Sequence, residues 1–290
     1  MFGGNWTEEK LTRLAKYLRA YVTIFHANPR ARHFKISYLD AFAGAGVRVA
    51  PEAQASEPGF PELTEPDAAA FRSGSARVAL EVRPPFHRYV FVERDRASSA
   101  RLEDLKLEFP DLADRIQIHR SESNTFVRTW CSSMSERRDR AVLFLDPYGM
   151  QVEWATIQAI AETRAIDLWV LFPLGAAVNR LLTRTSPPPP YWAGSLDRLF
   201  GTDTWRAAFY ASSPQLTMFG DDPTNEKIAD FTMIGRYFIR RLESVFAGVA
   251  PNPLALYNSR GVPIYLLCFA AGNPKAADLA VRIAGDILRR

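Results

Sequence analysis

The sequence contains little cysteine, histidine or lysine, and it has no long apolar run. Its two cysteines, Cys131 and Cys268, exclude a disulfide framework or a cysteine-rich zinc module formed by this chain alone, and they favour a reducing compartment. The four histidines have no metal-ligand spacing, and Cys131 lies in a predicted helix without a paired histidine. We therefore expect no metal site and no catalytic thiol in this chain.

Membrane segments are missing from the sequence as well. No run approaches the roughly eighteen apolar residues that a spanning helix needs. The first residues, MFGGNWTEEKLTRLAKY, are charged and amphipathic, unlike a secretory signal. We expect a cytoplasmic protein without a membrane partner, and the hydrophobic content of 47% predicts a packed core.

Charge is distributed unevenly along the chain. The formal net charge is +4, but residues 51–72 hold five carboxylates against one arginine, which leaves 35 basic and 27 acidic residues, or +8, in the remainder. A basic body attracts nucleic acid or another polyanion; the alternative is a coding bias, because the chain has 30 arginines beside 6 lysines. The acidic segment is interpreted either as a lid or polyanion mimic over the basic body or as a solvated loop. Its carboxylates are Glu52, Glu57, Glu62, Glu65 and Asp67.

Periodicity predicts a helix from Thr7 to Phe25, with Thr7 as its N-cap and Asn28-Pro29 as its end. We expect this helix to dock on the core through Leu11, Leu14, Leu18, Val22 and Phe25.

After this helix, short apolar runs alternate with helix-compatible segments, which predicts a parallel sheet covered on both faces. The predicted strands are HFKISYLDAFAGAG, His87–Val92, Ile116–His119, Ala141–Leu145 and Ile166–Phe172, and the helices are Ser75–Val82, Ala97–Phe109, Thr125–Met134 and Glu153–Thr163.

The C-terminal stretch LALYNSRGVPIYLLCFA breaks this alternation and reads as two strands joined by a turn, with a helix from Lys275 to Leu288 after them. A mostly parallel sheet that ends in an antiparallel hairpin is the layout of class I methyltransferases, and an ordinary dinucleotide-binding domain lacks it. We predict one Rossmann-like α/β domain over residues 1–290. Two insertions interrupt it, the acidic loop 51–72 and a mainly helical segment, 176–250, with a long helix near Asn225 to Phe246.

The segment YLDAFAGAGV is the strongest functional signal. A buried strand brings Asp40 to its carboxyl end, and Gly44 and Gly46 allow the backbone to approach a ligand closely. A carboxylate is badly placed beside a pyrophosphate but well placed to bind the ammonium group of S-adenosylmethionine (SAM). The pattern Asp40-x-Phe42-x-Gly44-x-Gly46 therefore favours SAM over NAD as the cofactor, with an ordinary glycine turn as the alternative.

Acidic residues also follow the next two strands. Glu93 can accept hydrogen bonds from the hydroxyl groups of a ribose, and Asp95 is a competing candidate two residues later. After the third strand, a side-chain oxygen of Glu122 or Asn124 can accept a hydrogen bond from the adenine amino group. Each of these residues is also an ordinary loop residue, so the interpretation gains weight only from their shared position at strand ends.

The fourth strand ends in Asp146-Pro147-Tyr148-Gly149. Proline fixes the backbone, so that the Asp146 carboxylate and a carbonyl group can converge on one amino group, and Tyr148 offers a ring on which a base can stack. The motif predicts a site that holds an exocyclic amine with its nitrogen aimed at the sulfonium methyl group. A common Asp-Pro turn is the alternative.

These motifs resemble those of class I SAM-dependent methyltransferases that modify amino groups of nucleobases. DPYG lacks the second proline of the Asp/Asn-Pro-Pro-Tyr motif of amino-methylating DNA enzymes and is closer to the Asp-Pro-Phe/Tyr-Gly motif of tRNA guanine-N2 dimethyltransferases. Over the whole chain, the sequence resembles the three-Cys-motif partner family at WTEEKL, YLDAFAGAG, FLDPYGMQVEW, AIDLWVLFPLGAAVNRLL and LYNSRGVPIYLLCFAAGNPKA. This resemblance implies a methyltransferase-like fold and a functional partner protein that carries the three-cysteine motif.

Three further residues are candidates for substrate contact. Asn179 and Arg180 follow the fifth strand, where Arg180 can reach a phosphate or carboxylate group, and Trp154 can stack on a base. A surface position for Arg180 and core packing for Trp154 are the alternatives.

The leading hypothesis is a SAM-dependent N-methyltransferase for a nucleic-acid base or related amine, working with a three-Cys-motif partner. A recognition or scaffold subunit of the same fold is the second hypothesis. An NAD-dependent oxidoreductase is disfavoured by Asp40 and by the terminal hairpin.

Overall fold

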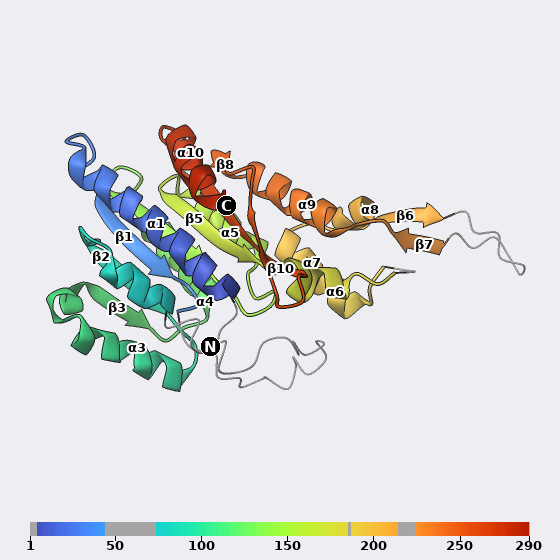
Figure 1. Cartoon of the computed structure of the whole chain (residues 1–290), viewed down its shortest axis with the longest axis horizontal. Helices are drawn as coiled ribbons and strands as arrows, with labels where there is room; N and C mark the ends of the chain where they lie inside the picture. The colour runs from blue at the N-terminus through green and yellow to red at the C-terminus, as the bar shows by residue number, and fades with distance from the viewer. Residues whose placement is uncertain (1–4, 44–73, 185–186, 214–223, 290) are drawn as a thin grey trace, which may run out of the picture.

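A mixed sheet forms the centre of the computed structural model, which describes residues 5–43, 74–184, 187–213 and 224–289 (Figure 1). The sheet has eight strands in the order β3-β2-β1-β4-β5-β10-β8, and β9 pairs with β10. Its strands are β1 (Lys35–Asp40), β2 (Arg88–Val92), β3 (Ile116–His119), β4 (Asp139–Leu145), β5 (Ile166–Phe172), β8 (Gly248–Val249), β9 (Leu254–Tyr257) and β10 (Pro263–Ala271).

The direction of the strands follows the predicted layout. β3, β2, β1, β4 and β5 run parallel, with Asp40 of β1 opposite Phe91 of β2 and Phe144 of β4. β10 is antiparallel to both β5 and β9. The central strands are almost wholly buried, as expected of parallel strands covered on both faces. The mostly parallel sheet with its antiparallel C-terminal hairpin confirms the prediction of a class I methyltransferase-like fold.

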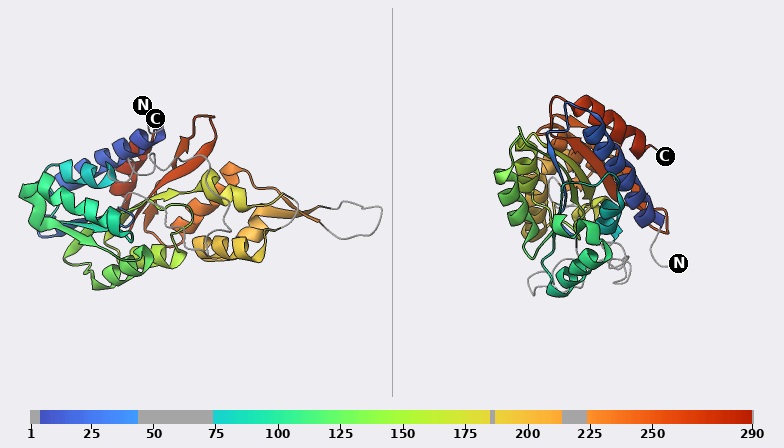
Figure 2. Two further views of the ribbon diagram at one scale, coloured as in Figure 1. Left: turned by 90° about the horizontal axis from the view of Figure 1, so that it is seen from below. Right: turned by 90° about the vertical axis from the view of Figure 1, so that its left-hand side faces the viewer.

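Helices cover both faces of the sheet (Figure 2). α1 (Asn5–Ala27), a helix over residues 74–81, α3 (Arg96–Glu108) and α10 (Ala277–Leu288) cover one face, and α1 and α10 lie side by side there. α4 (Ser123–Ser133), α5 (Trp154–Glu162), α7 (Pro190–Phe200), α8 (Trp205–Phe209) and α9 (Phe231–Glu243) cover the other. Short turns at η2 (Pro110–Arg115), η3 (Leu174–Val178) and α6 (Asn179–Leu181) complete the helical elements. Among the described helices, none combines the length and the apolarity that crossing a membrane would need.

α1 differs from its prediction at the start and on its buried face. It begins at Asn5, so Thr7 lies inside the first turn and is not the N-cap, whereas its end at Ala27 agrees with the predicted stop. Leu14, Leu18 and Val22 are buried as expected. The same row of residues, spaced by four, continues backwards through Lys10 to Trp6, and both of these side chains are buried as well.

The second insertion contains strands as well as helices. A two-stranded ribbon, β6 (Tyr210–Ser213) and β7 (Thr224–Lys227), projects from the body of the molecule (Figure 1). The prediction of a helix from about Asn225 was therefore wrong, and α9 begins at Phe231 because the Asp230 side chain caps it by accepting from the Met233 amide at 2.7 Å. The acidic segment 51–72 lies outside the described residues.

Candidate functional site

The carboxyl ends of β1, β2 and β4 meet at one edge of the sheet because these strands are parallel neighbours. Asp40 is the last residue of β1, Glu93 directly follows β2, and Asp146 directly follows β4. The structure thus brings three of the predicted carboxylates to one edge, where ligands of open α/β sheets bind. Gly44 and Gly46, the predicted cofactor-binding glycines, lie outside the described residues.

The Asp40 carboxylate is fully buried and hydrogen-bonded. One of its oxygens accepts from Ser75 Oγ at 2.7 Å, and the other accepts from the amide of Phe42 at 3.3 Å. Burial raises the pKa of Asp40 from 3.8 to about 7; the Ser75 hydrogen bond opposes this rise, and the charge of Asp146 adds to it. Near neutral pH, Asp40 is therefore present in both forms, and only the ionised form can attract an ammonium group.

Asp146 forms a buried ion pair with Lys10. The Nζ atom of Lys10 lies 2.5 Å from Oδ2 of Asp146, and the side chains are 0% and 3% exposed. The ammonium group also lies 5.3 Å from the centre of the Phe144 ring, a cation–π distance. Within the described ranges, this is the one hydrogen bond of the Asp146 carboxylate.

Sequence reasoning missed Lys10, although a signal for it exists. Lys10 lies on the row Trp6-Lys10-Leu14-Leu18-Val22, which is otherwise apolar. A lysine in a core row is rarely buried without a partner. The nearest acidic groups in sequence, Glu8 and Glu9, point to other faces of the helix, so the partner had to come from elsewhere in the fold.

Contacts at both ends of this part of α1 hold Lys10 in place. Trp6 stacks on Tyr265 of β10 with ring centres 5.3 Å apart. Arg13 donates to the carbonyl groups of Ile287 and Arg289, at 2.8 and 3.0 Å, where α10 ends. α1 is therefore joined to the sheet and to α10 on either side of Lys10.

The turn after Asp146 has a defined shape. Pro147 is buried, Tyr148 is half-buried, and Gly149 adopts a left-handed conformation with φ +66°, which favours glycine at that position. The Tyr148 amide donates to Oε1 of Gln151 at 3.3 Å. The three predicted catalytic residues, Asp146, Pro147 and Tyr148, therefore belong to one compact turn at the edge of the sheet.

Asn124 fastens this turn to α4. Its side chain donates to the carbonyl of Gln151 at 2.8 Å and accepts from the Glu153 amide at 3.0 Å and from Thr156 Oγ1 at 2.9 Å. Asn124 is buried, so these bonds replace water on all sides of the amide. The residue has a structural role that the sequence pattern did not indicate.

Glu122 and Asp95 act as helix caps. Glu122 accepts from the amides of Asn124 and Thr125 at 2.9 and 2.7 Å at the start of α4. Burial raises the pKa of Glu122, but the hydrogen bonds from these amides lower it by more than burial raises it. The pKa of Glu122 is therefore below its ordinary value. Asp95 accepts from the Ser98 amide at 2.8 Å at the start of α3, and Oε1 of Glu93 accepts from the Asp95 amide at 2.6 Å. A contact between Glu93 and a ribose stays a prediction. A contact between Glu122 and adenine stays a prediction.

The predicted substrate contacts lie in different surroundings. Asn179 Oδ1 accepts from Lys227 Nζ at 2.7 Å, and Arg180 is exposed beside it. Trp154 is 2% exposed, and the Arg241 guanidinium lies 4.4 Å from the centre of its ring. The prediction that Trp154 stacks on a substrate is therefore corrected: its indole is enclosed in the core.

Both cysteines are also buried, and burial raises the pKa of the Cys131 thiol to about 12.

Comparison with known proteins adds similarity of shape at low sequence identity. No family model and no curated protein sequence matches the chain. The solved structure of LPL1258 from Legionella pneumophila is 11% identical over 99% of this chain and 92% of its own, with a TM-score of 0.47. The N-terminal domain of EvdMO1, crystallised in the presence of SAH and D-fucose, is 8% identical over 89% and 81% of the two chains, with a TM-score of 0.37. M. jannaschii TYW2 in complex with AdoMet is 12% identical over 79% of each chain, with a TM-score of 0.28. At these values, the assignment of the fold depends on the strand order itself.

Proposed function

We propose that this chain is a SAM-dependent N-methyltransferase that acts on a nucleic-acid base or a related amine, together with a partner protein of the three-cysteine-motif type. One observation carries the proposal: Asp40 and the Asp146-Pro147-Tyr148 turn stand at the carboxyl ends of the adjacent parallel strands β1 and β4. This edge is where such sheets bind their ligands. It combines a carboxylate suited to an ammonium group with a second one suited to an amine.

The residues at this edge fit the groups of SAM by their chemistry. Asp40, with Phe42 and the segment of Gly44 and Gly46, would hold the methionine end, and Glu93 would accept from the ribose hydroxyls. Glu122 would lie toward the adenine. When bound, SAM supplies a methyl group activated by the sulfonium charge, so this chain has to align the acceptor and exclude water.

Asp146 would bind the amine of the acceptor. Its Oδ2 atom already accepts from Lys10, so the second oxygen, Oδ1, is the atom that would accept an N–H of the acceptor. The ion pair with the buried ammonium group of Lys10 fixes the position of this carboxylate. We therefore assign Asp146 to orientation of the amine rather than to removal of its proton, while Pro147 fixes the turn and the Tyr148 ring supports the base.

A methyl-transfer assay tests this proposal. The full chain is incubated with SAM carrying a tritiated methyl group and, in separate reactions, with total tRNA, ribosomal RNA or single-stranded DNA; labelled nucleosides are then identified by mass spectrometry. We expect methylation of an exocyclic amino group in one pool and its loss in Asp146→Ala. Absence of transfer to every pool, by a protein that binds SAM, would contradict the proposed nucleic-acid substrate.

One observation favours a second function, that of a non-catalytic recognition or scaffold subunit. The buried ion pair with Lys10 engages the carboxylate that an acceptor would need. If Asp40→Ala and Asp146→Ala variants, checked for folding, still support the cellular role of the protein and its partner, catalysis by this chain is not required. Loss of that role in both variants would favour the enzyme.

A further inference from the structure

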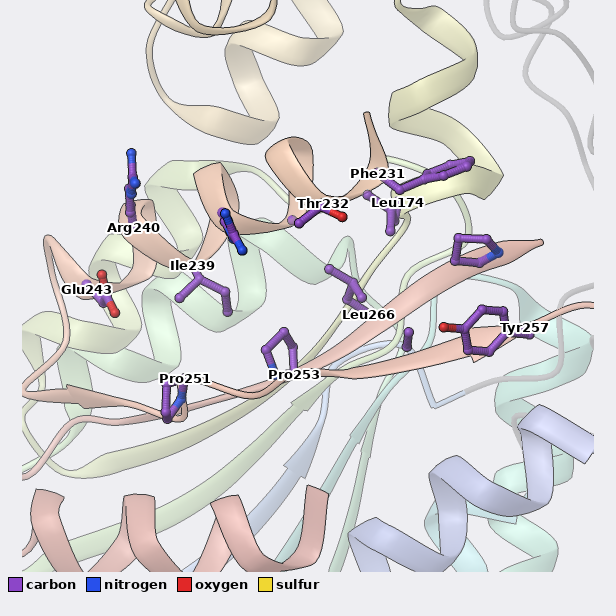
Figure 3. Close-up of a pocket in the computed structure, with 14 residues that line it drawn as sticks. Leu174, Phe231, Thr232, Ile239, Arg240, Glu243, Pro251, Pro253, Tyr257 and Leu266 are labelled. Atoms are coloured by element: carbon purple, nitrogen blue, oxygen red, sulfur yellow. The ribbon is translucent and has the colours of Figure 1, made fainter. Parts of the chain in front are cut away.

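A groove lies between α9 and the β9–β10 hairpin, on the face of the sheet opposite α1 (Figure 3). Its volume is about 470 Å³. Ile239 of α9 and Leu266 of β10 form the floor with Ala255 of β9, and Figure 3 shows Ile239 and Leu266 between the helix and the hairpin. The groove is thus apolar at its base and is built from two elements far apart in the sequence.

The helix side of the groove is basic. Arg236 and Arg240 lie one helical turn apart, both are exposed, and both line the groove. Neither forms an ion pair with a carboxylate of the residues that the structure describes. Glu243 lies further along the same helix, at the end marked by Pro251. The groove therefore offers two unneutralised positive charges beside an apolar floor, and a negative charge at one end.

The dimensions fit an extended peptide. The hairpin side of the groove runs from Pro251 to Tyr257, and its extended part is β9, whose four residues span roughly 13 Å. A short extended segment that lies along β9 would bring its apolar side chains against Ile239 and Leu266. The volume is also within the range of pockets that enclose a ligand.

Charge favours a peptide over a nucleic acid as the occupant. A nucleic-acid strand carries a phosphate at every step and needs positive charge along its whole path. Here Arg236 and Arg240 provide such charge on one wall only, and Glu243 would repel phosphate at the far end. An acidic peptide can carry carboxylates only at the positions that face Arg236 and Arg240, and uncharged side chains elsewhere along the groove.

We propose that this groove binds an extended segment of a partner protein, with apolar side chains on its floor and carboxylates facing Arg236 and Arg240. Charge-assisted hydrogen bonds from the two guanidinium groups would select acidic residues at those positions. Glu243 would exclude an acidic residue from the end near Pro251. This inference goes beyond methyl transfer and does not depend on it, because none of the residues assigned to Asp40 or Asp146 chemistry lines the groove.

Peptide selection tests the proposal. Random dodecapeptides displayed on phage are panned against the full chain, and enriched peptides are synthesised with a fluorescent label for anisotropy titration. We expect enrichment of acidic residues next to apolar ones, and about tenfold weaker binding to Arg236→Glu/Arg240→Glu. Glu243→Gln should bind at least as tightly as the unaltered chain.

A matched charge control separates local from overall effects. Arg137→Glu/Arg282→Glu makes the same change in net charge at exposed arginines outside the groove, and its affinity should stay within about twofold of the unaltered chain. SAM titrations of the same variants report on the other site independently. Failure to enrich any peptide, or equal affinity for the groove variant and the unaltered chain, overturns the proposal. Binding of a dodecameric oligothymidylate that depends on Arg236 and Arg240 would also overturn it, in favour of a nucleic-acid groove.

Discussion

The ammonium group of Lys10 lies 2.5 Å from the Asp146 carboxylate, 136 positions away in the sequence, and both side chains are buried. The pair joins the N-terminal helix to the turn after β4. Asp146, the residue proposed to bind the acceptor, therefore has its counter-ion on α1, a helix that precedes the alternating strands and helices of the core.

Removal of the positive charge alone should destabilise the fold. Lys10→Met leaves the Asp146 carboxylate buried without a counter-ion, and we expect a loss of about 3–5 kcal/mol in the free energy of unfolding. Lys10→Met/Asp146→Asn removes both charges and should recover much of that loss. Urea unfolding followed by circular dichroism measures the four free energies, those of the unaltered chain, Lys10→Met, Asp146→Asn and the double variant. Simple additivity of the two single substitutions would show that the groups are not coupled.

Asp40 should make stability depend on pH. The folded protein holds the Asp40 proton up to about pH 7, whereas the unfolded chain releases it near 3.8. The unfolded state therefore binds fewer protons between these values, and this contribution to the free energy of unfolding falls as the pH rises, by at most about 1.4 kcal/mol per pH unit, and levels off above pH 7.

Asp40→Asn provides the comparison for this pH dependence. Burial also raises the pKa of Asp167, to about 6, so both groups contribute to the decline between pH 4 and 6. The variant should keep only the Asp167 part of that decline and should lose the decline between pH 6 and 7. Unfolding titrations at half-unit pH intervals measure both curves. Parallel curves for the variant and the unaltered chain would mean that Asp40 titrates normally.

Asn124 should be important for stability although it has no assigned chemistry. Asn124→Ala removes the bonds to Gln151, Glu153 and Thr156 and leaves buried partners unsatisfied, so we expect a loss of about 2–4 kcal/mol. Ser132→Ala, at an exposed position of the same helix, should change stability by less than about 0.5 kcal/mol. Equal effects of the two substitutions in urea unfolding would contradict the role given to Asn124.

Two glycines with nearly the same backbone conformation should respond differently to alanine. Gly201 and Gly261 have φ values of +66° and +74°, but a Cβ atom at Gly201 would lie 2.0 Å from the Trp154 ring, whereas the space at Gly261 is open. We expect Gly261→Ala to cost only the conformational penalty of about 1–2 kcal/mol, and Gly201→Ala to cost more. Thermal unfolding of both variants checks the order, and a larger effect at Gly261 would contradict the packing around Trp154.

Much of the fold could be predicted from the sequence because its signals are local. The apolar runs that became β1, β2, β4 and β5 alternate with helical segments, and a turn around Asn258 to Gly261 joins the two strands of the hairpin. The start of α9 was misplaced because β7 depends on pairing with β6, which no local pattern indicates. Strand formation by a polar segment such as Thr224–Lys227 is decided by its partner strand.

The site was predicted only in part, for a related reason. Asp40, Glu93 and Asp146 could be found because each follows a recognisable strand. Lys10 could not be connected to Asp146, because the contact depends on how α1 packs over the sheet. Trp154 shows the opposite error: its position beside the motif suggested a ligand, whereas packing against Arg241 and Gly201 encloses it.

Calorimetric titration of the full chain with SAM, and separately with NAD, is the most direct test of the central claim. We predict that SAM binds and NAD does not, that SAM affinity rises between pH 6 and 8 as Asp40 loses its proton, and that Asp40→Asn weakens binding and removes this rise. Absence of SAM binding at high micromolar concentration by the folded protein, or a preference for NAD, would contradict the claim.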